Sequence, residues 1–466
     1  MKIPVRSFVA CLLSFTFLAG TAAAFEVRMP DFERFVLPNG LTVIMVKKSL
    51  LPIVEGQLII RSGALSDPAG KEGLANMVIR MLARGAAGKT AADISRAMDD
   101  SGAEMRFFAD WETSRVSFRV LKDEFRKILE LSADLARLPD FSSEEFLKEK
   151  MVVKAEIQSL DNDNWNIADR WFFHALYRGL RLGKAAQGEA ASVENLKIED
   201  VTAFHRKNYL PANAVLFLGG DIDRGDLGLV TKAFSGWAKA VSPVPAIAKP
   251  SSRVVGRTIW LIDKPDMSQC QIRIGNKGIP WNHPDHSSAQ VLNAIFGGGF
   301  SSLLMEELRR KRGLTYGVSS QFEFDQPDGP FYIWTFTENT KIGELLTLTL
   351  DLMRKVRTGA ISETEVEAAK QYLLGSSAGG LQSPELVGSL LLRLHWAGMP
   401  LKDIWADSKS IQSVTAEQVR LAAKKYIDPD NNIIVILGKR SEIEGQVKGF
   451  GADLKFAHYR EGSDRP

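Results

Sequence analysis

The chain has 466 residues, of which 45% are hydrophobic and 25% are charged. This composition is ordinary for a globular protein of two or more domains, and it excludes a disordered, collagen-like or coiled-coil chain. The 59 Lys and Arg residues and the 56 Asp and Glu residues leave a formal net charge of +3. Such a balance gives no electrostatic reason to expect nucleic acid or an anionic membrane as a partner.

Residues 1–24 have the three parts of a secretory signal: a basic start, an apolar run at Phe8–Gly20 and small residues before the cut. The run is too short to span a bilayer comfortably, so we expect cleavage between Ala24 and Phe25. We expect the mature chain in a periplasm or otherwise secreted, with no stable membrane insertion. Only Cys270 then remains, which leaves no partner for an intramolecular disulfide, and its alternating surroundings predict a strand.

Hydrophobic periodicity predicts mixed strands and helices along the first half of the mature chain. Strands are expected at 32–46 (a hairpin turning at Pro38–Gly40), at 54–61 and at 106–120 (a second hairpin), and helices at 73–87, 90–101, 122–138 and 142–160. Ser142, with Glu145 three positions later, matches a capping box at the start of the last helix.

A repeat joins the two halves of the chain. The segments that begin at Ser192 and Ser410 both predict a helix, a Tyr, a Pro-containing turn and an apolar strand ending in Gly, with Tyr209 and Tyr426 in register 217 positions apart. A period this long indicates two homologous domains instead of a solenoid.

The second half is expected to open with strands at 258–263 and 269–275, followed by helices at 287–296, 341–358 and 362–377. Prolines between the halves predict an extended linker. The predicted organisation is a signal peptide at 1–24, an N-terminal domain at 25–238, a linker at 239–256, a C-terminal domain at 257–455 and a tail at 456–466.

The helix expected at 73–87 carries the first motif. Its segment GKEGLANMVIRML resembles the active-site helix of the pitrilysin/insulinase-type zinc metallopeptidases, which is written G-L-A-H-x-x-E-H-x-L. In that family the two His hold zinc and the Glu activates a water molecule. Here Asn76 and Arg80 stand at the ligand positions and Ile79 stands at the base position. Neutral Asn is a poor zinc ligand, Arg is a permanent cation, and Ile accepts no proton.

The resemblance extends to a later helix with two acidic positions. KAEIQSLDND places Glu156 at the family's third zinc ligand, and Glu149 matches an acidic residue kept beside the site. Two interpretations stay open. The carboxylates are solvated residues on a charged helix, or Arg80 occupies the place of the metal and pairs with Glu156, Glu149 or both.

No replacement metal site presents itself in the sequence. His283 and His286 are close, but Asp285 is the single nearby acid, and we expect a surface loop before a helix. We therefore expect no cofactor in this chain, and the family resemblance implies that zinc is held by a homologous partner subunit.

The second motif is FGGGFSSLLMEELRRKRGLTYGVSS, at Phe296–Ser320. It resembles the family's C-terminal substrate-binding segment, in which an Arg and a Tyr seven positions apart bind a substrate main-chain carbonyl. Those positions are Arg309 and Tyr316 here. Both side chains donate hydrogen bonds, as a carbonyl or developing oxyanion requires.

The resemblance covers nearly the whole mature chain and implies an α+β fold: two homologous α/β-roll domains arranged like a clam shell. It also implies a division of labour, because some relatives split zinc and substrate contact between homologous subunits. We expect a non-catalytic, substrate-binding subunit of an exported zinc peptidase heterodimer that acts on peptides or unfolded polypeptides. The alternatives are a stand-alone zinc peptidase with atypical ligands and a non-enzymatic peptide-binding or scaffold protein.

Overall fold

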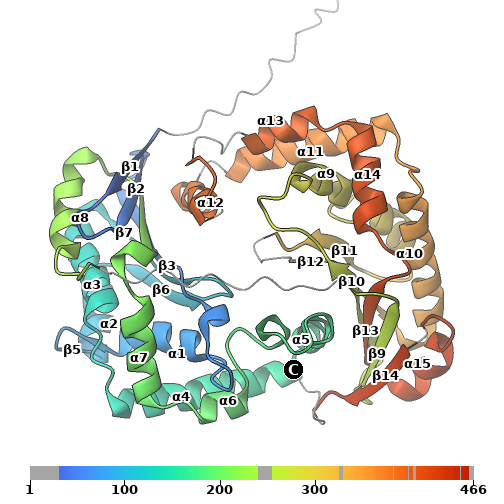
Figure 1. Cartoon of the computed structure of the whole chain (residues 1–466), viewed down its shortest axis with the longest axis horizontal. Coiled ribbons are helices and arrows are strands. Elements are labelled where there is room, and N and C mark those ends of the chain that lie inside the picture. Colours follow the sequence, from blue (N-terminus) through green and yellow to red (C-terminus); the bar gives the residue numbers. More distant parts are fainter. Residues whose placement is uncertain are drawn as a thin grey trace, which may run out of the picture.

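The computed structural model describes residues 31–239, 254–324, 329–380, 383–396, 398–401, 406–451 and 453–460. The predicted signal peptide and most of the predicted linker lie outside these ranges. Two six-stranded sheets organise the described part of the chain, one in each half of the sequence (Figure 1). Predictions of a mixed α+β fold and of two domains of one kind are therefore confirmed.

The N-terminal sheet mixes parallel and antiparallel neighbours. Its order is β1 (Phe32–Val36), β2 (Thr42–Lys47), β8 (Ala214–Gly220), β3 (Ile53–Ile60), β7 (Ser114–Leu121) and β6 (Glu104–Ala109). Helices cover one face, where they share a hydrophobic core with the sheet. They are α1 (Leu74–Met81), α2 (Ala91–Asp100), α3 (Phe125–Arg137), α4 (Ser143–Ser159), α6 (Ala190–Glu194), α7 (Ile198–Asn208) and α8 (Leu227–Phe234).

The C-terminal sheet repeats this order. It runs β14 (Asp453–His458), β9 (Arg257–Asp263), β13 (Asn432–Gly438), β10 (Gln269–Lys277), β12 (Pro330–Glu338) and β11 (Val318–Phe322). Its covering helices are α9 (His286–Phe296), α10 (Ile342–Arg357), α11 (Glu363–Gly380), α13 (Ala406–Ser413), α14 (Ala416–Tyr426) and α15 (Arg440–Val447), with the π-helical segment Met305–Lys311. The repeat predicted from Tyr209 and Tyr426 thus corresponds to α7–β8 and α14–β13. The two sheets differ in the direction of one edge strand: β1 is antiparallel to β2, whereas β14 is parallel to β9.

One helix from each half packs against the sheet of the other half. Helix α5 (Asn164–Leu176) packs Trp171 and Phe172 against Trp260, Tyr332 and other residues of the C-terminal sheet. Helix α12 (Pro384–Trp396) packs against the free face of the N-terminal sheet through a second mixed cluster. Figure 1 shows both helices between the two sheets. The halves therefore share two cores, in addition to the core that each has of its own.

A buried charge pair fixes α5 on the C-terminal sheet. The side chain of Arg273, on β10, is fully buried, and its Nε lies 2.5 Å from Oδ1 of Asp169 on α5. The guanidinium also lies 4.4 Å from the ring centroid of Trp165. At the equivalent place in the other sheet, Gln57 of β3 donates to the backbone carbonyl of Glu385 on α12, at 3.3 Å. The exchange of helices thus has matching polar contacts on both sides.

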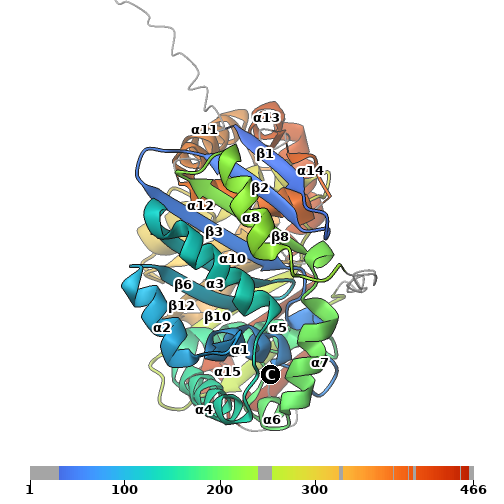
Figure 2. The same ribbon diagram turned by 90° about the vertical axis from the view of Figure 1, so that its left-hand side faces the viewer.

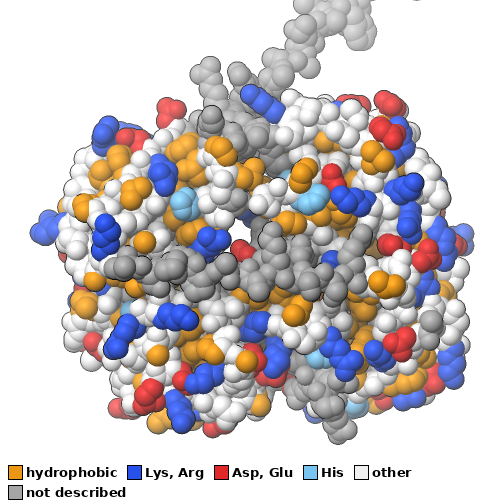
Figure 3. Space-filling view, in the orientation of Figure 1, with side chains coloured by type: hydrophobic (Ala, Val, Ile, Leu, Met, Phe, Trp, Pro, Cys, Tyr) orange, Lys and Arg blue, Asp and Glu red, His pale blue; other side chains and the backbone are white. Residues whose placement is uncertain are grey.

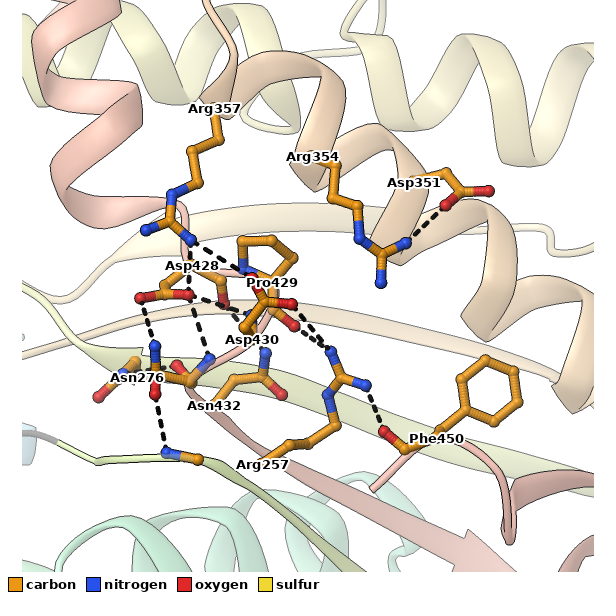
Figure 4. Close-up of polar contacts among 12 residues, drawn as sticks. Arg257, Asn276, Asp351, Arg354, Arg357, Asp428, Pro429, Asp430, Asn432 and Phe450 are labelled. Atoms are coloured by element: carbon orange, nitrogen blue, oxygen red, sulfur yellow. Dashed lines mark hydrogen bonds and ion pairs between the residues drawn. The ribbon is translucent and has the colours of Figure 1, made fainter. Parts of the chain in front are cut away.

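Arginine side chains also hold the turn before β13 (Figure 4). Arg257 donates to the backbone carbonyls of Pro429 and Phe450, and Arg357 pairs with Asp428 at 2.9 Å. Asn432 donates to the Asp428 carbonyl at 3.0 Å. These bonds satisfy backbone groups where β9, β13 and β14 begin to run parallel, so we assign the cluster to the support of the sheet.

The face of the molecule drawn in Figure 3 carries charged side chains of both signs. Figure 3 shows Lys and Arg side chains interspersed with Asp and Glu side chains over both halves of the face in view. None of the helices in the described ranges combines the length and the apolar composition that a bilayer crossing requires.

Three sequence predictions need correction. The helix predicted at 73–87 is shorter, because α1 ends at Met81 and passes through a 3₁₀ turn at Leu82–Arg84. Ser142 precedes α4 as expected, but its side chain makes no capping bond, and Glu145 instead pairs with Lys148 at 2.8 Å. His286 is buried against Trp281 and Phe324 and does not lie on the surface.

Candidate functional site

The first candidate site lies between α1 and α4, which are adjacent in the N-terminal half (Figures 1 and 2). Gly73 is the N-cap of helix α1; it has a φ of 96°, and its Cα has no room for a side chain, since a Cβ would lie 2.5 Å from the Gln187 carbonyl oxygen. The carboxylate of Asp67 accepts the backbone N–H groups of Gly73 and Ala75, each at 2.8 Å, and Arg181 pairs with it at 2.9 Å. The first turn of the helix is therefore fixed in place.

The predicted ligand and base positions lie on two faces of α1. Ile79 is fully buried and belongs to the hydrophobic core of the N-terminal half. Asn76 and Arg80, one turn apart, are half-buried. Ile79 thus contributes apolar volume to the core, whereas Asn76 and Arg80 keep partial access to solvent.

Arg80 joins α1 to both predicted carboxylates of α4. Its Nε lies 2.5 Å from Oε1 of Glu149, and its two terminal nitrogens lie 3.0 Å from the two oxygens of Glu156 in a bidentate pair. The pairing hypothesis drawn from the sequence is therefore met by the geometry. Burial alone would lower the pKa of the Arg80 guanidinium, but its hydrogen bonds and ion pairs with the two carboxylates raise that pKa above its ordinary value.

Arg84 is a fourth member of this cluster that the motif did not indicate. Its Nε lies 2.6 Å from Oε2 of Glu149, so the carboxylate of Glu149, whose side chain is 1% exposed, is held between two guanidinium groups. Arg84 follows Arg80 by four positions, a spacing that would put both side chains on one face of the helix predicted at 73–87, and this spacing was the available signal. Two positive and two negative charges make the cluster neutral.

These side chains do not fit the zinc that the family resemblance implies for active relatives. The Arg80 guanidinium occupies both oxygens of Glu156 and one of Glu149, and it is a cation that donates and never accepts. In the described ranges, no group of three or more His, Cys, Asp or Glu side chains is arranged to hold a metal. The cluster of Arg80, Arg84, Glu149 and Glu156 is a set of ion pairs that links α4 to α1 and to the turn after α1, and we call it the strut.

The second candidate site surrounds Arg309 in the C-terminal half. Arg309 lies in the π-helical segment Met305–Lys311, a rare conformation that often accompanies functional sites. The basic residues that follow it all face carboxylates: Arg310 faces Glu306, Lys311 faces Glu307 and Arg312 faces Glu344. Arg309 has no ion pair with any described residue.

An aromatic ring takes the place of a carboxylate beside Arg309. Its guanidinium lies 5.2 Å from the ring centroid of Phe300. Tyr316, the other predicted substrate-binding residue, is 79% exposed, and no hydrogen bond or ring contact joins it to Arg309 within the described part of the chain. Both predicted side chains thus keep donors available to a ligand from solvent.

A tight glycine loop carries Phe300. Ser320 donates its backbone N–H to the Gly297 carbonyl at 3.1 Å, and Ser319 donates its hydroxyl to the same oxygen at 2.8 Å. A Cβ on Gly297 would lie 2.5 Å from the Ser320 hydroxyl oxygen, and one on Gly298 would lie 2.5 Å from the Asn293 amide nitrogen. The glycines allow the loop to approach α9 and β11 closely.

Cys270 is part of the core. The residue is fully buried on β10, as the sequence predicted for a strand residue, and burial raises the pKa of its thiol to about 12. A thiol with so high a pKa is not a nucleophile at neutral pH.

The fold and the first site define a class: a duplicated α+β fold in which an ion-pair cluster lies at the positions that the resemblance assigns to metal ligands. Comparison with known proteins gives the family. Residues 42–189 match the model of the insulinase family (peptidase family M16), and residues 195–373 match the model of the peptidase M16 inactive domain. The chain belongs to the insulinase family of peptidases.

Relatives in sequence and in structure agree with this assignment. An uncharacterized zinc protease of Mycobacterium bovis is 27% identical over 402 residues, with 85% of this chain and 90% of the relative covered. One of Rickettsia felis is 28% identical over 345 residues, with 74% and 82% covered.

Two solved structures match the fold. The crystal structure of a peptidase M16 inactive domain from Pseudomonas fluorescens has a TM-score of 0.82 and 27% identity, with 88% of this chain and 98% of that chain covered. A protease from Helicobacter pylori also gives 0.82, at 21% identity and with 88% and 100% covered, and shows likeness of fold alone.

Proposed function

We propose that this chain is the non-catalytic, substrate-binding subunit of an exported zinc peptidase heterodimer that acts on peptides or unfolded polypeptides. One observation carries the proposal: the guanidinium of Arg80 pairs with Glu149 and Glu156, the residues that the resemblance assigns to the metal site, whereas Arg309 has no carboxylate partner among the described residues. On this proposal the first site cannot hold zinc or activate water, and the second offers hydrogen-bond donors to a substrate.

In the proposed complex, a homologous subunit with an intact His-x-x-Glu-His helix supplies the zinc and the general base. This chain closes the substrate chamber and contributes Arg309 and Tyr316. The Arg309 guanidinium and the Tyr316 hydroxyl donate to a main-chain carbonyl of the bound peptide and to the oxyanion that develops from it. The proposed export rests on the signal sequence predicted at 1–24, and the partner would need to reach the same compartment.

The test is peptide hydrolysis by the mature chain, by a His-x-x-Glu-His homologue from the same organism and by the two mixed in equal amounts. We expect no hydrolysis by this chain alone and activity of the mixture above that of the homologue. Arg309→Ala in this chain is expected to lower kcat/KM of the mixture about 100-fold, as the loss of an oxyanion donor does. Arg440→Ala, which removes a cation stacked on Phe456 far along the chain, is the matched control and should leave the rate unchanged.

Two outcomes would overturn the proposal. Chelator-sensitive hydrolysis by this chain alone would make it a peptidase in its own right. A mixture whose enhanced activity is indifferent to both Arg309→Ala and Tyr316→Phe would make it a scaffold instead of a substrate-binding subunit.

A further inference from the structure

Aromatic side chains are exposed around the glycine loop that carries Phe300. Phe300 is 68% exposed and Tyr372, on α11, is 52% exposed. A Cβ placed on Gly299 would lie 3.6 Å from ring carbons of Tyr372, so this ring packs beside the residue that precedes Phe300. Exposed apolar surface that gathers in one place, unlike scattered single residues, marks a binding site.

The guanidinium of Arg309 is part of the same surface. The guanidinium lies 5.2 Å from the Phe300 ring centroid, within cation–π range, and its N–H donors have no ion-pair partner among the described residues. The neighbouring Arg310 and Lys311 are paired with Glu306 and Glu307, so they do not compete for a ligand there. A charged hydrogen-bond donor thus lies next to exposed aromatic rings.

We propose that Phe300 and Tyr372 make the Arg309 site selective for peptides that carry a large apolar side chain beside the carbonyl bound by Arg309. The inference rests on the proposed function and names the substrate class of that site. In this proposal the Phe300 ring contacts the ligand side chain and also lies beside the Arg309 guanidinium, which is 5.2 Å from the ring centroid.

The chemistry of the surface favours an apolar peptide residue over a charged one. An acidic side chain would pair with Arg309 but would leave both rings in contact with water, while a basic side chain would be repelled. An apolar side chain buries ring surface, at about 25 cal/mol per Å² of apolar area removed from water, and its carbonyl satisfies the guanidinium. A peptide with an apolar side chain therefore matches both the aromatic rings and the hydrogen-bond donors of the site.

The experiment measures the binding of capped peptides to the mature chain by isothermal titration. The probes are N-acetylated, amidated Gly-Ala-X-Ala-Gly peptides with Phe, Ala or Asp as X. We expect the Phe peptide to bind at least about tenfold more tightly than the Ala peptide, as the burial of one aromatic side chain allows. The Asp peptide is expected to bind no better than the Ala peptide.

Variants separate the aromatic surface from the cation. Phe300→Ala and Tyr372→Ala should each reduce the preference for Phe over Ala to about threefold or less, and Phe300→Leu should retain part of it. Arg309→Ala should weaken all three peptides. The control is Phe456→Ala, which removes a 41% exposed ring that also stacks on an arginine, Arg440 at 3.8 Å. Phe456→Ala should leave the affinities for all three peptides unchanged.

Each outcome has a distinct meaning. If Phe300→Ala with Tyr372→Ala leaves the preference intact, or if the Asp peptide binds best, the inference is wrong while peptide binding through Arg309 stands. If peptides bind equally well to the Arg309→Ala variant, the proposed substrate role of Arg309 fails as well. Thermal unfolding of every variant confirms that a loss of binding is not a loss of fold.

Discussion

The strut between α1 and α4 predicts how stability depends on Arg80. In Arg80→Ala the buried carboxylate of Glu149 loses one of its two charged partners and keeps Arg84 at 2.6 Å. The bidentate pair with Glu156 is lost completely, but Glu156 is 53% exposed and returns to water. Glu149 and Glu156 should therefore contribute unequally to the free energy of unfolding.

The expected loss of stability in each variant follows from how buried the two carboxylates are. A charged hydrogen bond to a buried group contributes about 1.5–3 kcal/mol, and the exposed Glu156 pair adds at most about 1 kcal/mol. We expect Arg80→Ala to lower the free energy of unfolding by about 2–3 kcal/mol. Glu156→Gln should cost under about 1 kcal/mol. Glu149→Gln should cost about 3 kcal/mol, because it leaves two guanidinium groups without their shared anion.

The assay is urea unfolding of the mature chain, followed by tryptophan fluorescence and circular dichroism to test whether the transition is two-state. Arg96→Ala is the control, since Arg96 is 68% exposed and pairs with Asp93 at 3.4 Å, and it should cost under about 0.5 kcal/mol. If Arg80→Ala costs no more than this control, or if Glu156→Gln costs more than Glu149→Gln, the account of the strut is refuted.

Three further predictions concern other parts of the molecule. Asp169→Asn leaves the buried Arg273 without an anion and should lower the free energy of unfolding by about 3 kcal/mol, measured in the same urea assay. Gly297→Ala should shift the glycine loop and weaken peptide binding in titrations, whereas Gly375→Ala, with no heavy atom within 4 Å of the added Cβ, should not. The Cys270 thiol, with a pKa raised to about 12, should resist alkylation at pH 8 in the native mature chain and react in denaturant; reaction in the native state would contradict its burial.

Much of this architecture could be predicted from the sequence. Period-2 and period-3.6 patterning placed most strands and helices, and the 217-residue repeat around Tyr209 and Tyr426 indicated the duplicated domains. The positions of Asn76, Arg80, Glu149 and Glu156 followed from the motif. The bidentate pairing of Arg80 was one of two open interpretations, and geometry was needed to choose between them.

Other features could not be predicted from pattern alone. Periodicity shows that α5 and α12 have apolar faces, but it does not say that each covers the sheet of the other half. Arg84 and Asp67 belong to no motif, and their roles depend on groups that are far away in sequence. The chain brings these groups together only through tertiary packing.

The measurement that tests the central claim most directly uses an inactivated partner. This chain is mixed with the homologue in which the Glu of His-x-x-Glu-His is replaced by Gln, and peptide hydrolysis is compared with that of the unaltered mixture. Since the account places the zinc and the base in the partner, it predicts that hydrolysis falls to background. Hydrolysis that persists and is abolished by a chelator would show that this chain carries a catalytic centre of its own, and would contradict the account.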